Sequence, residues 1–500
     1  MRTVPRVLLI VGAAAAVPLA VWLFDVVRRD RKPPVAAKAG NANNPNNPTA
    51  AKPAPGGTNP PQNPRPLAGV AGCGAAACHG APGTGTLSPD IWQSSFTVWN
   101  TTDPHAKAYR ALTTPLARTI IEGMHGKTPA TEEPRCLACH TNPTTIGDTS
   151  LRIEGMNCES CHGNPNKWSV EHTSFGTRER HKAYESVGMP KLFDLGTRAE
   201  VCAGCHVGAP ADPLRGLPLR DMNHDMIAAG HPPLNFDFAD AMHRLPKHWF
   251  EKDRTAADPR TPAGPAFEAK AWLVGRVAVA AASCSLTADR ATRADPWPEF
   301  AEMNCFACHH EFEPKGWRLS AARRTPARKP GMAAWQTIWP VTRADDFVKL
   351  NSEASHDLTA LIANMERTRY PDTTAAAKSA TSAATKLGAL RNEFSRMNAK
   401  DAAKLARGVF LAIPPERADI LDWDEAKQVF FGLAALDRSR LKLVGTADPV
   451  LAKFEEHLRF PQTPDKSGFR SPRGYDPASG RDLFRECLKS VPARADVIER

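Results

Sequence analysis

The sequence predicts a mainly α-helical protein with little regular sheet. Cysteine and histidine recur at spacings that fit single helical turns, and apolar residues recur every three to four positions near residues 273–284 and 426–436. Few stretches alternate apolar and polar residues as strands do. A length of 500 residues allows two to four domains, and the 42% hydrophobic and 23% charged residues exclude a polytopic membrane protein and a wholly disordered chain.

Residues 1–32 are predicted to be an N-terminal membrane anchor or a signal. Their apolar run from Val7 to Phe24 spans about 27 Å as a helix, close to a hydrocarbon core of about 30 Å. A cleaved signal and a buried core helix are the alternatives. The basic residues that follow conflict with export under the positive-inside rule, and we give them less weight than the motifs below. Residues 33–67, rich in Pro, Asn and Ala, predict a disordered linker.

Ten of the twelve cysteines form five close pairs, and a histidine directly follows each pair. Cys-x-x-Cys-His is the attachment signature of haem c, because one helical turn presents two thiols to a porphyrin edge and an imidazole to its iron. The first motif is wider and must loop out its extra residues. The predicted haem-binding cysteines are Cys73, Cys78, Cys136, Cys139, Cys158, Cys161, Cys202, Cys205, Cys305 and Cys308. The predicted proximal ligands are His79, His140, His162, His206 and His309.

Zinc is the alternative for repeated cysteine pairs. Zinc does not require a histidine after every pair, and histidine occupies only 16 of the 500 positions, so chance does not explain the pattern. We therefore expect five covalently attached haem c groups in a pentahaem domain at residues 68–320. Haem attachment occurs on the exported side of the bacterial membrane, so we expect a location on the periplasmic side of the cytoplasmic membrane, anchored or secreted.

The net charge of +11 on its own would suggest a nucleic acid or an anionic membrane as partner. Five haems would bring ten propionates, and we interpret the basic residues as propionate partners. We expect no nucleic acid. The expected partners are redox proteins or a quinol-linked electron donor, together with the membrane through the N-terminal anchor.

Nine further histidines lie between residues 68 and 320, enough for a second ligand on every iron. His231 stands in a rigid Gly-His-Pro loop that can present an imidazole. His310 directly follows a motif histidine and cannot reach the same face of that iron. The candidate distal ligands are His105, His172, His224 and His231, followed by His248.

The stretch EGMNCESCHG at Glu154–Gly163, the upstream HAKA at His105–Ala108 and the downstream His172 resemble the cytochrome c-554 family of multihaem electron carriers. The resemblance covers roughly residues 70–250. It implies a mainly helical multihaem cytochrome c domain with haems in close pairs, periplasmic electron transfer, and His105 and His172 as distal ligands. It also implies that the iron at His140 lacks a sixth protein ligand. The widened first motif, the fifth motif and the long C-terminal extension depart from the family.

Two functions are consistent with these patterns. The leading one is a multihaem c-type cytochrome that transfers single electrons, because iron with two histidine ligands changes oxidation state without ligand exchange. The alternative is a multihaem oxidoreductase in which one five-coordinate haem acts on a small nitrogen oxide or a hydroxylamine-like substrate. We assign no catalytic residue, since none of the five motifs ends in the lysine of the pentahaem nitrite reductases.

Residues 331–500 are predicted to form a separate helical-bundle-like domain. The stripe from Ala426 to Leu436 and the Ala-rich stretch Thr373–Met397 predict two of its helices. This domain either buries its own stripes or covers the haem domain, or it docks a redox partner. Within the haem domain, the stripe at 273–284 predicts a helix that buries Cys284, and a disulfide with Cys487 is the alternative.

Overall fold

The computed structural model describes residues 69–83, 90–173, 188–252, 258, 261–303, 352–367, 370–411, 423–459 and 476–499. The predicted anchor and linker, the fifth Cys-x-x-Cys-His motif and His310 lie outside the described residues. The described chain is mostly helical, and its extended pairings are three isolated β-bridges. The prediction of a mainly α fold is therefore confirmed.

One long helix, α12 (Phe267–Arg293), organises the largest hydrophobic core. It is the one described helix long and apolar enough to cross a membrane, and 89% of its most apolar window is buried inside the protein. The predicted stripe at 273–284 lies within it, and Cys284 is only 1% exposed. Other helices therefore surround α12, as they do the core helix of a water-soluble domain. Its neighbours are α9 (Leu195–His206), α11 (Phe238–Arg244), α17 (Thr373–Arg396), α18 (Ala399–Leu411) and α19 (Trp423–Val444).

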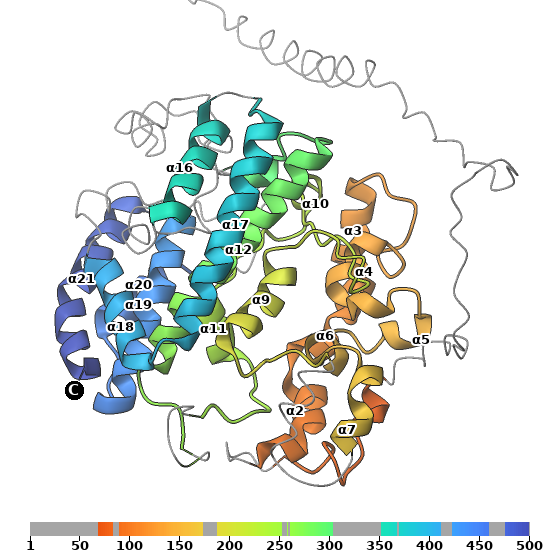
Figure 1. Cartoon of the computed structure of the whole chain (residues 1–500), viewed down its shortest axis with the longest axis horizontal. Coiled ribbons are helices and arrows are strands. Elements are labelled where there is room, and N and C mark those ends of the chain that lie inside the picture. Colours follow the sequence, from red (N-terminus) through yellow and green to blue (C-terminus); the bar gives the residue numbers. More distant parts are fainter. Residues whose placement is uncertain are drawn as a thin grey trace, which may run out of the picture. The chain divides into compact units, whose positions relative to one another are not determined.

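Figure 1 shows α17 running beside α12, with α16 (Ser352–Arg367) next to α17. The helices α18 and α19 also pack against α21 (Pro477–Glu499), which in turn contacts α20 (Pro449–His457). The two helices predicted from the Ala-rich stretch and from the 426–436 stripe are thus present as α17 and α19. Residues from both sides of the gap at 304–351 contribute to one core.

Buried polar groups fasten these helices to one another. The Arg276 guanidinium of α12 donates to Gln428 Oε1 of α19 over 2.6 Å, and the Gln428 amide donates to Asn235 Oδ1 over 3.0 Å. The backbone N–H of Ala269 donates to Ser439 Oγ over 3.0 Å. Such bonds fix the relative positions of the two helices, because an unmade bond at a buried site is costly.

The segments that carry the first three motifs are built differently. Their short helices contact mostly their neighbours along the chain, and the one additional hydrophobic cluster consists of six buried residues near Leu137. This is a small core for a stretch of about a hundred residues. Bound porphyrins would supply the missing apolar core.

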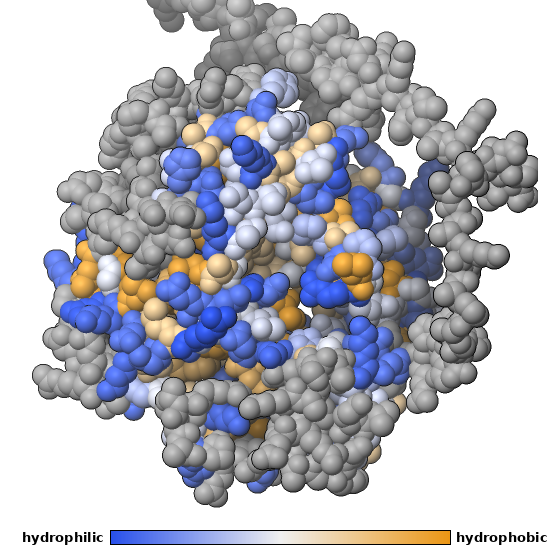
Figure 2. All heavy atoms as spheres, in the orientation of Figure 1, coloured by the Kyte–Doolittle hydropathy of each residue, from blue (hydrophilic) through white to orange (hydrophobic). Residues whose placement is uncertain are grey.

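On the face in Figure 2, the described surface is largely hydrophilic, with hydrophobic side chains in smaller areas between.

Candidate haem centres

Three of the four described motifs end short helices. The motif histidine is the last residue of α4 (Pro134–His140), of α6 (Cys158–His162) and of α9 (Leu195–His206). Acidic side chains cap the N-termini of two of these helices. Glu133 accepts a hydrogen bond from the backbone N–H of Arg135, and Asp194 accepts one from the backbone N–H of Thr197. The wider first motif instead lies in turns that follow a 3-10 helix at Val70–Gly72. The one-turn geometry thus holds for the three tight motifs that the structure describes.

His79 of the first motif faces His172. Their ring centroids are 5.9 Å apart and the ring planes differ by 5°. The carbonyl oxygen of Trp92 lies 2.8 Å from His79 Nδ1, so it can accept the proton of that nitrogen and leave Nε2 free as a ligand.

His206 of the fourth motif faces His105, with ring centroids 6.1 Å apart. Asp103 Oδ1 lies 2.9 Å from His105 Nδ1, and the hydrogen bond to this carboxylate raises the pKa of His105. Burial lowers the pKa of His206 to about 4, with a further contribution from the nearby His105. His206 is therefore neutral at pH 7 and offers a nitrogen lone pair.

His140 of the second motif faces His231, with ring centroids 6.4 Å apart. The carbonyl oxygen of Ala108 lies 2.9 Å from His140 Nδ1, and that of Pro232 lies 2.8 Å from His231 Nδ1. Burial lowers the pKa of His140. The family resemblance implied no second protein ligand here, whereas the structure places the Gly-His-Pro loop opposite His140.

These three spacings fit one iron between each pair of rings. Metal–nitrogen bonds of about 2.0 Å, with about 1.1 Å from each nitrogen to its ring centre, predict centroids about 6.2 Å apart for two imidazoles on opposite faces of an iron. In the described part of the chain no three His, Cys, Asp or Glu side chains gather as a zinc site requires.

His162 of the third motif has no second imidazole in ring contact within the described residues. Burial lowers its pKa to about 3, and among the neighbouring histidines His248 contributes most to this shift. Burial also lowers the pKa of His248 to about 4. The Nδ1 atoms of both rings are buried and have no hydrogen-bond partner in the part of the chain that the structure describes. His248 is therefore the candidate second ligand nearest to this motif.

The cysteines of different motifs meet in pairs. Cys73 and Cys158 are close enough to shift each other's pKa, and so are Cys139 and Cys205. Cys161 is exposed, yet desolvation raises its pKa to about 12. A thiol that faces an internal space lined by protein is both exposed and desolvated. A cysteine that carries a haem would have such surroundings.

The family-like segments HAKA and EGMN touch each other. The backbone N–H of Met156 donates to the carbonyl oxygen of His105 over 3.0 Å. Gly155 has a φ of +66°, and a Cβ there would lie 2.7 Å from the same carbonyl oxygen. Only glycine allows this approach, which holds the His105 turn in place.

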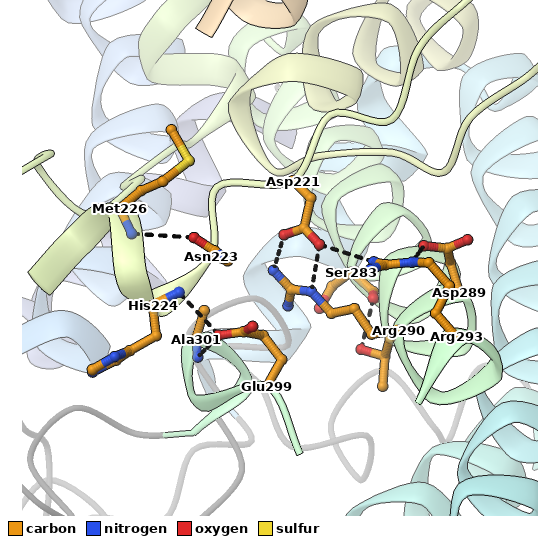
Figure 3. Close-up of polar contacts among 11 residues, drawn as sticks. Asp221, Asn223, His224, Met226, Ser283, Asp289, Arg290, Arg293, Glu299 and Ala301 are labelled. Carbon is orange, nitrogen blue, oxygen red and sulfur yellow. Dashed lines mark hydrogen bonds and ion pairs between the residues drawn. The ribbon is translucent and has the colours of Figure 1, made fainter. Parts of the chain in front are cut away.

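Figure 3 shows the surroundings of His224, the first residue of α10 (His224–Ala228). Its backbone N–H donates to Glu299 Oε1 over 2.9 Å, and its ring lies 5.7 Å from that of Phe300. Asp221, three residues earlier, pairs with Arg290 over 2.5 Å and so ties this loop to α12. His224 thus lies beside the segment that precedes the fifth motif in the sequence.

Sequence reasoning missed the residues that orient the ligands. Asp103 stands two residues before His105, a spacing at which a carboxylate can cap a turn and also reach a histidine ring, and this signal was available. The backbone carbonyls that face His79, His140 and His231 could not be found, because every residue has one.

Part of the chain matches a known protein family. The family model described as cytochrome c554 and c-prime matches residues 75–163. Neither the curated proteins nor the solved structures include a match to the chain. The matched stretch contains the tight motifs at His140 and His162 and most of the wider first motif. This match confirms the resemblance of residues 75–163 to the cytochrome c554 and c-prime family, and it indicates covalently bound haem c and haem-based electron transfer.

Proposed function

We propose that this protein is a periplasmic pentahaem c-type cytochrome that transfers single electrons. One observation carries the proposal: three motif histidines each face a second histidine, with ring centroids 5.9, 6.1 and 6.4 Å apart. Each pair of histidines would hold one iron, and an iron held by two histidines suits electron transfer and offers no place for a substrate.

The chain's own residues prepare these sites for iron. Burial keeps three motif imidazoles neutral at pH 7, because it lowers the pKa values of His140, His162 and His206. Acceptors at Nδ1 of His79 and His105 hold the rings in the tautomer that binds metal through Nε2. Haem c, when bound, supplies the ferric–ferrous couple.

The contacts between cysteines support closely spaced haems. Cys73 and Cys158 belong to the first and third motifs, and Cys139 and Cys205 to the second and fourth. Haems attached at these neighbouring cysteines would be close to each other in pairs. A redox protein or a quinol-linked donor would supply the electrons, and the N-terminal anchor would hold the chain at the membrane.

Mass spectrometry tests the haem count. Protein expressed with the haem-attachment machinery is expected to carry five haems, and the double variant Cys305→Ala/Cys308→Ala is expected to carry four. A colourless protein, or a double variant with as many haems as the parent, would contradict the pentahaem proposal.

Electron paramagnetic resonance tests the ligand pairs. We expect only low-spin ferric signals from the parent protein, and one new high-spin signal in His231→Ala, because the iron at His140 then loses its second ligand. His356→Ala is the matched control, since the His356 side chain is 86% exposed. A high-spin signal that is already present in the parent and unchanged by His231→Ala would count against the His140–His231 pair.

One observation favours the alternative function. His162 is the described motif histidine without a second ring in contact, so an open position for a small nitrogen oxide would be at its iron. His248→Ala separates the two functions. If His248 is the second ligand, this variant gains a high-spin signal. If the parent already shows one high-spin iron that binds nitric oxide, and His248→Ala leaves it unchanged, the enzyme hypothesis is favoured.

A further inference from the structure

A half-buried arginine, Arg220, lies beside the fourth motif. The loop at 209–220 leaves the end of α9 and returns to it, where the backbones of Ala209 and Arg220 exchange two hydrogen bonds of 2.9 Å each. These bonds anchor the backbone of Arg220 next to the motif helix. The loop therefore returns the Arg220 side chain to the haem attachment site.

The guanidinium of Arg220 packs against the motif itself. A Cβ built on Gly204 would lie 3.6 Å from Arg220 Nη2 and 3.7 Å from Cζ, so the glycine leaves this side of the helix open to the guanidinium. The pKa of the Cys205 thiol is lowered first by its contact with Cys139 and also by the nearby charge of Arg220, and the Nε atom of Arg220 is buried without a hydrogen-bond partner among the described residues. The charge thus sits at a haem-bearing cysteine.

No carboxylate neutralises this charge within the described part of the chain. Other arginines near the core have such partners: Arg198 pairs with Glu251, and Arg290 pairs with Asp221. Since the Cys205 side chain also contacts Cys139 of the second motif, the charge of Arg220 lies close to the attachment points of two haems.

We propose that Arg220 raises the reduction potentials of the two haems attached through Cys139 and Cys205. A ferric porphyrin core carries one positive charge more than a ferrous one, so a nearby fixed positive charge disfavours the oxidised state. Partial burial strengthens the effect, because water screens the charge less. This inference rests on the proposed function, since it requires haem at the second and fourth motifs.

Redox titration of the full-length, haem-loaded protein, followed at the Soret band, tests the proposal. Arg220→Gln is expected to lower at least one of the midpoint potentials, whereas Arg220→Lys is expected to keep them near the parent values. Arg215→Gln is the matched control, because Arg215 lies on the same loop but is 69% exposed and paired with Asp212 over 2.6 Å. It should shift no potential.

The outcomes separate this inference from the proposed function. Unchanged or raised potentials in Arg220→Gln, with all haems attached, overturn the role of Arg220 and leave electron transfer standing. Absence of haem at the second or fourth motif in the parent overturns the proposed function itself. If Arg220→Gln yields no haem-loaded protein, Gly204→Asp is compared with Gly204→Asn. Only the aspartate can pair with Arg220 in place, and equal potentials in these two variants also overturn the inference.

Discussion

At the scale of single residues, Gly155 gives the sharpest prediction. Two observations require glycine at this position. Its φ is +66°, and a Cβ here would lie 2.7 Å from the His105 carbonyl oxygen. Gly155→Ala is expected to cost about 2 to 4 kcal/mol, of which about 1 kcal/mol comes from the backbone conformation and the rest from crowding.

Denaturant unfolding at equal haem content measures this cost. Gly216→Ala is the matched control, because Gly216 has the same φ of +66° but no atom within 4 Å of a Cβ. It should lose only about 1 kcal/mol. Equal losses in the two variants would show that the contact with His105 adds nothing.

The same scale shows how far the candidate site could be predicted. The cysteines and motif histidines follow from local spacing, because one helical turn sets their geometry. The distal candidates follow from the number of histidines and, for His231, from a rigid loop. Their pairing could not be predicted, because His79 meets His172 and His140 meets His231 only through contacts between segments far apart in the sequence. The position of Arg220 beside the fourth motif could not be predicted for the same reason.

At the scale of helices, apolar periodicity located α19 and the middle of α12, because a helix buried on one face must repeat its apolar residues, and the Ala-rich composition of residues 373–397 located α17. It did not show which helices touch. The composition changes after residue 330, yet α12 and α17 pack together in one core. Apolar periodicity predicts that one face of a helix is buried, but it does not predict which helix packs against that face.

The contact between α19 and α12 depends on Gly432. A Cβ there would lie 2.4 Å from the Phe410 ring and 2.6 Å from the Trp272 ring, and both rings are buried. We expect Gly432→Ala to lower the free energy of unfolding by about 1 to 3 kcal/mol, because overpacking outweighs the gain in helix propensity. Gly388→Ala in α17 is the control, since no atom lies within 4 Å of a Cβ. Thermal unfolding should show Gly388→Ala to be more stable than the parent by about 0.5 to 1 kcal/mol. If both variants gain stability, the proposed overpacking at position 432 is contradicted.

At the scale of the whole molecule, one buried carboxyl couples the shared core to pH. Asp237 caps α11 by accepting from the backbone N–H of Asp240 over 3.0 Å, while its Oδ2 is buried without a partner. Burial raises the pKa of Asp237 to about 6, against the opposing charge of Arg276, whose own pKa burial lowers to about 10. Arg276 stays protonated below pH 8, so Asp237 is the member of the pair that titrates between pH 4 and 6.

The sign of the effect follows from linkage. A raised pKa means that the folded state binds a proton that the unfolded state has already lost above pH 3.8, so folding stability falls as pH rises from about 4 to about 6 and is level above that range. The full change is about 3 kcal/mol at most. Asp237→Asn keeps an acceptor for the cap and removes the proton, so urea unfolding should lose this slope, whereas Asp482→Asn on the exposed surface should keep it. A slope that survives in Asp237→Asn would mean that Asp237 is ionised throughout, and that Arg276 neutralises it inside the core.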